Sequence, residues 1–434
     1  MKKNYQKNAT SATMPVLPEA VSVVLAELAG DVQEGLLAMA VGTGLQVMAA
    51  MMNADVEAVC GPRGKHDLAR TAVRHGSEDG SVTLGGRRVP VTRPRMRATD
   101  GSGELPVASY ELFSQTEVLG RMAMARMLAG LSTRRYPLGL EPVGARVEAS
   151  ARSTSKSAVS RRFVAATETA LGELLAADLS GLDLVALMID GVHFGEHLCV
   201  VALGIGIDGV KHPLGLAEGS TENTSVVTDL LSGLRERGLD TTRPIFVGID
   251  GGGKALRAAV VRVFDHPVIA RCQEHKIRNV GSKLPDHLAS TVTKRMRAAY
   301  HADSALVAEA QLQALAKELE RTHPGAAGSL REGLAETLTV LRLGVSPTLA
   351  RTLRSTNSIE SMISIARTHS SNVKNWQNGN MALRWCAAGM IEAGKQFRRV
   401  NGHLHLPTLR GALDEHVAAQ TVDTVRHDEP VIAA

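Results

Sequence analysis

The feature of this 434-residue chain that most limits its fold is an alternation of short apolar runs with amphipathic segments, which starts near Leu182. Short apolar runs bounded by turn residues are typical of buried strands, whereas apolar residues spaced three and four apart indicate helices. We therefore predict strands in DLVALMID, HLCVVALGIGIDG, KHPLGLAEGS, RPIFVGID and the start of HPVIARCQEHKIRNVGSKL, and helices in TSVVTDLLSGLRERG, GGGKALRAAVVRVF and the end of HPVIARCQEHKIRNVGSKL. This alternation predicts an α/β fold.

The order of these elements narrows the fold class further. Three strands in a meander, followed by helix, strand, helix and strand, is the order of a ribonuclease H-like sheet. Residues 283–350 contain no strand candidate, and the chain from Thr356 to about Phe397 is mainly helical again. We therefore predict a ribonuclease H-like core made of residues 181–282 and 351–400, with an all-helical insertion at 283–350.

The amino-terminal third has a different character. Apolar residues at helical spacing dominate from about Leu17 to Met52, and a later alternation around Gly85-Gly86 indicates a β-hairpin. Between Arg63 and Arg97, nine basic residues stand against three acidic ones, a surplus of six that exceeds the +5 net charge of the whole chain. Arginines in such a cluster either contact DNA or protect a strand edge from pairing. The candidate DNA contacts on this hairpin are Arg87, Arg88, Arg93 and Arg95.

A second basic segment follows the hairpin. Ser155 can cap a helix that begins with small residues and presents Lys156, Arg161 and Arg162, a pattern that resembles a recognition helix of helix-turn-helix proteins. We therefore predict that residues 17–180 form a mainly helical DNA-binding region with a basic hairpin. Residues 1–16 are expected to be a disordered lead-in, and residues 401–434 a polar tail.

Composition excludes several classes of protein. With 44% hydrophobic and 21% charged residues, the chain is too apolar to be disordered throughout. No window approaches the roughly 18 apolar residues of a membrane helix, and the amino terminus lacks the apolar stretch of a signal peptide. Its four cysteines lie far apart and form no CxxC pair, which favours a reducing cytoplasm over a disulfide scaffold.

Three acids stand where a catalytic site could form. Asp190 and Asp250 each end an apolar run and precede glycine, in MID-G and GID-G, and Glu360 lies in the first turns of a predicted helix that Ser355, Thr356 or Asn357 would cap. An Asp-Gly pair after a strand is also typical of an ordinary turn. A glutamate in the first turn of a helix also complements the helix dipole. Together, three carboxylates suit a pair of Mg²⁺ or Mn²⁺ ions that promote phosphodiester transfer.

Four ordered blocks give the chain a resemblance to a known family. RCQEHKIRN contains Cys272 and His275 in a C/DxxH arrangement, FVGIDGGGKAL surrounds Asp250, LRSTNSIESMISIAR surrounds Glu360, and VKNWQNGNMALRWCAAGMIEAGKQFRR continues that block. From about Asp183 to Arg399, the sequence resembles the Mutator-type transposases of bacterial insertion sequences, which belong to the DDE transposases. The resemblance implies that Asp190, Asp250 and Glu360 are the catalytic acids, and that Cys272 and His275 are signature residues.

The resemblance also implies Mg²⁺-dependent cleavage and strand transfer at the ends of the protein's own element. Its partners would be double-stranded DNA, both terminal inverted repeats and target, and at least a second copy of the chain. We expect Arg278, Arg367 and Lys374 to contact the DNA backbone. Cys272 can serve as a small buried residue or take part in chemistry, while a Cys–His zinc site would need two more soft ligands. Two alternatives to a transposase remain: a ribonuclease H-like nuclease that only hydrolyses, and a catalytically inactive DNA-binding protein derived from a transposon.

Overall fold

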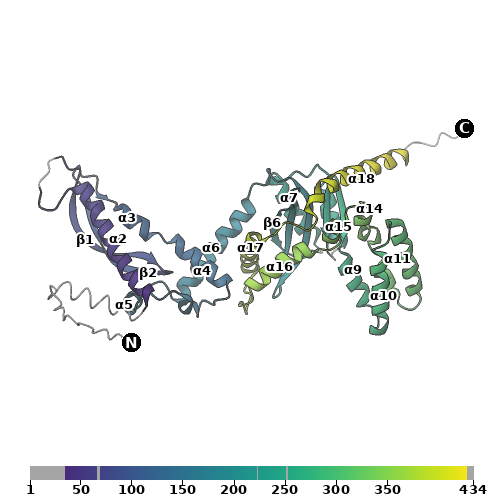
Figure 1. The fold of residues 1–434 in the computed structure, drawn as a ribbon, viewed down its shortest axis with the longest axis horizontal. Helices are drawn as coiled ribbons and strands as arrows, with labels where there is room; N and C mark the ends of the chain where they lie inside the picture. The colour runs from purple at the N-terminus through teal and green to yellow at the C-terminus, as the bar shows by residue number, and fades with distance from the viewer. Residues whose placement is uncertain (1–34, 66–68, 222, 251–252, 428–434) are drawn as a thin grey trace, which may run out of the picture. The chain divides into compact units, whose positions relative to one another are not determined.

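The computed structural model of this chain describes residues 35–65, 69–221, 223–250 and 253–427. These residues divide into two units (Figure 1). The first unit takes the described residues up to Arg126 together with Ser132–Arg162. The second unit takes Met127–Leu131 and the described residues from Phe163 onward. The predicted lead-in of residues 1–16 lies outside the described residues.

The first unit is built around a long β-hairpin, as the sequence predicts. Strands β1 (Ala72–Leu84) and β2 (Arg87–Ala98) pair antiparallel across the turn at Gly85-Gly86, where both glycines have positive φ, 50° and 80°. Two consecutive positive φ angles match the right-handed twist of the flanking strands and favour glycine at both positions. The short strand β3 (Glu104–Leu105) extends the sheet on the β2 side.

Helices of the first unit pack on this hairpin. Met48, Met52 and Val56 of α2 share one buried cluster with Val82 of β1 and Val89 of β2. The unit's helices are α2 (Leu36–Cys60), α3 (Ala108–Ser114), α4 (Glu117–Leu128), the 3₁₀ helix η1 (Tyr136–Gly139), α5 (Ala145–Ser150) and the start of α6 (Lys156–Ala176). The Ser155 hydroxyl accepts the Ala158 amide at 3.4 Å, so the predicted cap of α6 is confirmed.

The second unit contains a five-stranded mixed sheet with the spatial order β6-β5-β4-β7-β8. The first three pair antiparallel as a meander, and β7 and β8 then continue parallel to β4. The strands are β4 (Leu184–Phe194), β5 (His197–Gly206), β6 (Lys211–Glu218), β7 (Ile245–Ile249) and β8 (Pro267–Arg271). All five strands correspond to runs that the sequence predicts.

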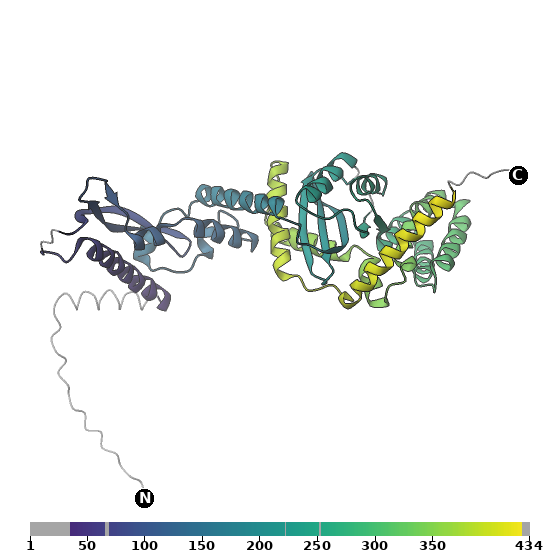
Figure 2. The same ribbon diagram turned by 90° about the horizontal axis from the view of Figure 1, so that it is seen from above.

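Helices cover both faces of this sheet (Figure 2). On one face, α7 (Thr224–Glu236) and α8 (Gly253–Val263) pack through a cluster of buried aliphatic residues. On the other face lie α16 (Asn357–His369), α17 (Gly379–Gln396) and α18 (Leu406–His427). Trp385 of α17 is buried there against Phe163, with ring centroids 4.5 Å apart.

Between the sheet and α16 the described elements are all helical, as predicted for residues 283–350. Helix α9 (Gln273–Gly281) follows β8 directly. It is followed by α10 (Asp286–Ala299), α11 (Ala305–Glu320), α12 (Pro324–Arg331), α13 (Leu334–Thr337), α14 (Thr339–Arg342) and α15 (Pro347–Leu353). These helices have a buried cluster of their own, which includes Val280, Val292, Leu312 and Leu330.

The carboxyl-terminal segment departs from its predicted role as a polar tail. After the 3₁₀ helix η2 (His403–His405), α18 buries Leu406, Leu409 and Leu413 against the sheet. Arg410 on the same helix pairs with Asp183 and donates to the Leu184 carbonyl at 2.9 Å. The tail prediction is therefore wrong for this part of the segment, because three leucines on one helix face suffice to dock it.

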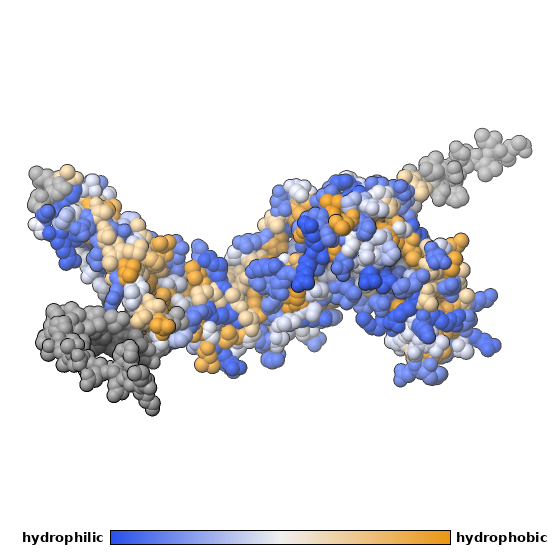
Figure 3. Space-filling view, in the orientation of Figure 1, coloured by the Kyte–Doolittle hydropathy of each residue, from blue (hydrophilic) through white to orange (hydrophobic). Residues whose placement is uncertain are grey.

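On the face shown in Figure 3, hydrophilic residues cover most of the surface, and hydrophobic residues gather over α2. Val47, Met51 and Val59 are the exposed large side chains of that helix, together with Leu36. In the part of the chain that the structure describes, none of the helices is long and apolar enough to cross a membrane.

The closest approach of α16 and α17 depends on a glycine. A Cβ atom on Gly389 would lie 2.6 Å from the Ala366 Cα atom, so Gly389→Ala forces the two helices apart. We expect this substitution to lower the free energy of unfolding by about 1–3 kcal/mol, measured by urea denaturation. The control is Gly172→Ala on α6, where an added Cβ meets nothing within 4 Å, and there alanine should stabilise the helix by about 0.5–1 kcal/mol. Equal effects of the two substitutions would contradict the close approach.

Candidate active site

Strand pairing brings the first two predicted acids together. The parallel register of β4 and β7 ends with Ile189 opposite Ile249, so Asp190 and Asp250 both follow the last pair of this ladder. The apolar run suggests that Asp190 is the last residue of its strand, but it is not. Strand β4 continues to Phe194 because its second half still pairs with β5.

Asp190 lies in a place that disfavours its charge. Burial, followed by the negative charge of Asp250, raises the pKa of Asp190 from 3.8 to about 6, and Glu360 adds to this rise. The Gly191 amide donates to Asp190 Oδ1 at 2.7 Å and offsets part of the effect. These influences show that all three predicted acids lie close enough to interact electrostatically.

His275 lies between the other two acids. Its Nδ1 atom is 2.7 Å from Asp250 Oδ1, and its Nε2 atom is 3.6 Å from Glu360 Oε1. Contact with Asp250 is the main cause that raises the pKa of His275 from 6.5 to about 10, with Cys272 contributing and burial opposing. The imidazolium therefore supplies a positive charge among the carboxylates at neutral pH.

Thr356 joins Glu360 to His275. It is buried directly before α16, and its hydroxyl donates to Glu360 Oε1 at 2.9 Å while lying 3.5 Å from His275 Nδ1. The hydroxyl makes no capping bond to the helix, so among the expected cap residues Thr356 has another role. The sequence contained the signal for this role, because residues four apart share a helix face.

Cys272 lies buried at the start of α9, next to His275. Burial alone would raise the pKa of its thiol, but hydrogen bonds with His275 and Thr356 outweigh burial and lower it. One ligand atom from each of Cys272, His275 and Glu360 lies within 4.8 Å of the others, so a cation could contact this group.

The donor atoms of this site fit a divalent cation that prefers oxygen. Asp250 Oδ1 is buried, and within the described residues its contact with His275 lacks the geometry of a hydrogen bond, so the oxygen keeps unused acceptor capacity. Asp190 and Asp250 also repel each other in a buried setting, which a cation between them would relieve. Hard cations such as Mg²⁺ take carboxylate oxygens as ligands.

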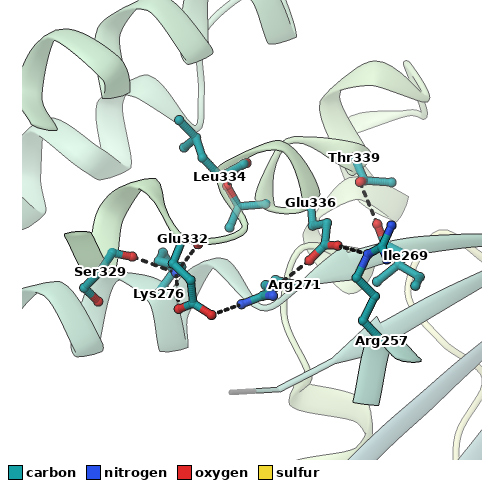
Figure 4. A network of polar contacts seen from close by, with 10 residues as sticks. Arg257, Ile269, Arg271, Lys276, Ser329, Glu332, Leu334, Glu336 and Thr339 are labelled. Atoms are coloured by element: carbon teal, nitrogen blue, oxygen red, sulfur yellow. Dashed lines mark hydrogen bonds and ion pairs between the residues drawn. The ribbon is translucent and has the colours of Figure 1, made fainter. Parts of the chain in front are cut away.

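A polar network ties the helix that carries His275 to the helical segment (Figure 4). Arg271, at the end of β8, donates to Glu336 at 2.5 Å and to Glu332 at 2.9 Å. Arg257 of α8 donates to the second oxygen of Glu336 at 2.9 Å. Local sequence patterns do not predict this network, because Arg271 and its acidic partners are more than 60 residues apart.

Lys276 and Gln273 complete the same attachment. The buried Lys276 ammonium donates to the carbonyls of Ser329 at 2.8 Å and Glu332 at 2.5 Å, and the Gln273 amide donates to the Thr337 carbonyl at 2.9 Å. Because both residues flank His275 on α9, these bonds fix the backbone that positions the imidazole.

Two glycines make room for Arg271. A Cβ atom on Gly253, three residues after Asp250, would lie 2.6 Å from its guanidinium nitrogens, and one on Gly333 would lie 2.4 Å from Nε. Gly333 also has φ of +60°, a conformation that favours glycine. The guanidinium therefore fits only because both positions lack a side chain.

Among the predicted DNA contacts of the hairpin, Arg87 requires a correction. Only 2% of this residue is exposed, and its guanidinium contacts the Glu141 carbonyl at 2.9 Å and the Glu148 carboxylate at 2.7 Å. A side chain committed in this way stabilises the first unit and cannot reach a phosphate without breaking the pair. The sequence could not indicate this burial, because Glu148 is 61 residues away.

The other three hairpin arginines are partly engaged within the first unit. Arg88 donates to the carbonyls of Ser81 and Ser114, at 2.6 and 2.5 Å. Arg93 pairs with Glu78 and stacks over the Tyr110 ring, and Arg95 forms a bidentate pair with Glu104 at 2.9 and 2.7 Å. A role for these three in DNA binding stays a prediction.

The remaining predicted contacts differ in exposure. Lys156 and Arg161 are exposed on α6, whereas Arg162 is half-buried and donates to the Ser153 carbonyl at 2.7 Å. In the second unit, Arg278, Arg367 and Lys374 are all exposed. Arg278 follows His275 by three residues on α9, and Arg367 follows Glu360 by seven on α16, so each shares a helix face with a site residue.

The first unit also contains a basic cavity. It measures about 590 Å³ and lies between the end of α2 and the hairpin. Arg63, Lys65, Arg70, Arg74 and Arg95 contribute to its lining. The basic surplus of the Arg63–Arg97 segment is therefore concentrated partly around this cavity and partly in internal ion pairs.

Comparison with known proteins identifies the class to which this site belongs. Residues 21–400 match the family model described as "Transposase, Mutator family", and the chain therefore belongs to this family. A transposase processes nucleic acid, so the clustered acids and the exposed basic residues belong to a protein of that class.

Several curated transposases are similar to the chain. The transposase for insertion sequence element IS6120 of Mycolicibacterium smegmatis is 28% identical over 245 residues, which cover 55% of this chain and 74% of that protein. The transposase for element ISRM5 of Rhizobium meliloti is 24% identical over 84% of this chain and 90% of its own length. The transposase for element IS256 in transposon Tn4001 of Staphylococcus aureus is 24% identical over 74% of this chain and 81% of its own length.

Arg271 and Arg257 share Glu336 and offer a matched test of the network. Arg271→Met leaves Glu336 paired only with the exposed Arg257 and Glu332 paired only with Lys276, and we expect it to lower the free energy of unfolding by about 2–3 kcal/mol. Arg257 is 56% exposed, so Arg257→Met should cost less than about 1 kcal/mol. Urea denaturation of both variants measures the difference, and equal losses would contradict the importance of Arg271.

The raised pKa of Asp190 predicts a pH-dependent gain in stability when its charge is removed. Because the folded pKa of about 6 exceeds the ordinary 3.8, ionised Asp190 destabilises the fold above pH 6, and this cost disappears as pH falls toward 4. In metal-free buffer, Asp190→Asn should raise the free energy of unfolding by about 2 kcal/mol at pH 7.5 and by much less at pH 4.5. A gain that does not depend on pH would show that the carboxylate is not strained.

Proposed function

We propose that this chain is a DDE transposase that cleaves DNA at the ends of its own insertion sequence and joins the freed ends to target DNA. The observation that carries this proposal is the electrostatic coupling of Asp190, Asp250 and Glu360 around His275 at one edge of the sheet. A carboxylate whose pKa is raised by burial and by a neighbouring negative charge, as that of Asp190 is, is typical of functional sites. Membership of the Mutator family supports the same activity.

The sheet order supports a ribonuclease H-like core within this proposal. An antiparallel meander of three strands continues into two parallel strands, in the order β6-β5-β4-β7-β8. The helices α10 to α15 would then be the insertion that separates the second acid from the third. Two acids come from adjacent strands and the third from a helix packed on the sheet.

Asp190, Asp250 and Glu360 would hold two Mg²⁺ or Mn²⁺ ions. When bound, such ions activate the attacking hydroxyl and neutralise charge on the leaving oxygen in phosphodiester transfer. The buried, underused Oδ1 of Asp250 and the strained charge of Asp190 support this assignment. Thr356 would orient Glu360 for the same purpose through its 2.9 Å hydrogen bond.

The chain's own residues provide the binding and orientation for the reaction. His275 stays protonated at neutral pH, so its N–H groups can donate to a phosphate oxygen near Asp250 and Glu360. Arg278 and Arg367 share helix faces with site residues and would contact neighbouring phosphates, and the exposed Lys374 would add to this contact. The exposed Lys156 and Arg161 would contact DNA from the first unit. The DNA would be double-stranded, at the terminal inverted repeats and at the target.

Two bond exchanges at phosphorus make up the proposed reaction. In the first, water attacks the phosphorus at the element end, a P–O bond to water forms while the bond to the 3′-oxygen breaks, and the products are a free 3′-hydroxyl and a 5′-phosphate. In the second, this hydroxyl attacks a phosphodiester of the target, forming one P–O bond while another breaks. Joining two ends of one element requires at least two active sites, so we propose a homodimer or larger assembly on DNA.

Loss of one acid tests the proposal directly. In an assay with labelled element-end duplex and Mg²⁺, Asp250→Ala should reduce cleavage by at least about 100-fold, because the site loses one of its paired carboxylates. Asp229→Ala removes an exposed carboxylate from α7 and serves as the matched control, with cleavage expected to equal that of the wild type.

The same assay separates the alternatives. A wild type that cleaves but never joins a pre-cleaved end to plasmid DNA would be a nuclease that only hydrolyses. A wild type that binds the duplex without metal-dependent cleavage would be an inactive DNA-binding protein. Equal cleavage by wild type and Asp250→Ala would overturn the assignment of the acids.

A further inference from the structure

A second basic cavity lies on the second unit, at the amino end of the helix that carries Glu360. It measures about 360 Å³ and is formed by the start of β6, the end of α15, the first turns of α16 and the segment that follows α17. Four cationic side chains line it, from Lys211, Arg351, Arg398 and Arg399. No local sequence pattern marks this site, because its residues come from four separate segments.

The charge of this cavity is unbalanced. Among the described residues that line it there is no carboxylate, and Arg351, Arg398 and Arg399 are exposed and form no ion pair within the described part of the chain. Lys211 is partly buried, with its ammonium 4.5 Å from the centre of the Phe397 ring. Four cations held around one hollow attract an anion, because each of them repels the others without one.

The segment that presents the two adjacent arginines is held in place from both sides. The Val400 amide donates to the Gly209 carbonyl at 3.0 Å, and the Thr352 hydroxyl donates to the Asn401 carbonyl at 2.9 Å. Gly402, with φ of +79°, lies so close to Leu349 that a Cβ atom would come within 2.6 Å of its amide nitrogen. The backbone of the cavity is therefore preorganised rather than a loop that closes on a ligand.

Neutral hydrogen-bonding groups face the same hollow from α16. Asn357, Ser358 and Ser361 line the cavity, and they are spaced so that they share one side of the helix. Ser361 directly follows Glu360, whose side chain lies about 100° around the helix from it. The cavity therefore lies at the same end of α16 as the third acid.

We propose that this cavity binds a backbone phosphate of the DNA strand that crosses the amino end of α16, next to the strand held at the acids. The inference rests on the proposed function, because it takes the ligand to be the DNA on which the acids act. Arginine and lysine neutralise the phosphate, and the serine and asparagine groups supply further hydrogen bonds, as is usual for contacts that set the register of DNA. The cavity therefore positions the DNA and takes no part in the bond exchange itself.

Salt dependence of DNA binding tests this proposal without reference to cleavage. The full chain and the triple variant Arg351→Gln/Arg398→Gln/Arg399→Gln are titrated into fluorescent duplex DNA in EDTA at several salt concentrations. Each phosphate contact contributes about 0.9 to the slope of log affinity against log salt, so the variant should lose about 1 from the slope. At about 100 mM salt its affinity should fall at least about tenfold.

Two controls make the comparison specific. Arg262→Gln removes the same kind of charge from α8, on the opposite face of the sheet, and should leave the slope unchanged. Ser361→Asp places a carboxylate in the cavity while all four cations remain, and should weaken binding much more than Ser361→Ala, which removes only one neutral hydrogen-bonding group. The serine pair also keeps the test valid if the triple variant does not fold.

Each result has a defined meaning. A lower slope for the triple variant, together with weaker binding by Ser361→Asp, supports the phosphate site even if the wild type never cleaves DNA. A slope equal to that of Arg262→Gln, or equal binding by Ser361→Asp and Ser361→Ala, overturns it. Inorganic phosphate, added at the concentration of the duplex phosphates, is a competitor for the cavity. If it displaces DNA from the wild type and the triple variant to the same extent, the cavity does not recognise the DNA strand.

Discussion

The parallel pairing of β4 and β7 is the constraint on which the rest of the site depends. Because the ladder ends with Ile189 opposite Ile249, two aspartates must follow on neighbouring strands and lie close together in a partly buried place. Burial, followed by the negative charge of Asp250, raises the pKa of Asp190 to about 6. The fold therefore holds a repulsion that a positive group must relieve, and His275 supplies one in the structure.

The position of His275 is itself a product of long-range packing. Its helix is short, and by itself a nine-residue helix is marginal in water. The start of this helix is attached to helices more than 50 residues further along the chain by Arg271, Gln273 and Lys276. The helical segment between the second and third acids thus has a structural task at the site, in addition to any contact with DNA.

Local patterns predicted the parts of the fold that depend on local chemistry. The Gly85-Gly86 turn, the five strands of the sheet and the cap at Ser155 all follow from residues within a few positions of one another. The burial of Arg87 was missed because it depends on Glu148, a distant partner. The extension of β4 past Asp190 was missed because the polar residues there hide the pairing with β5. Helix α18 was within reach of prediction, since Leu406, Leu409 and Leu413 already mark one face. Of the site, the acids and His275 could be named in advance, whereas the role of Thr356 required the geometry.

Strand β4 runs past Asp190, and this has a mechanical consequence. The residue's backbone is held by Val201 of β5 opposite it and by the β7 ladder just before it, so Asp190 is a fixed reference point. Glu360 instead stands on a helix whose contact with α17 passes through Gly389 and Ala366. Any change in the spacing of the acids must come from a displacement of α16 against a stationary sheet, and α17 would have to move with it.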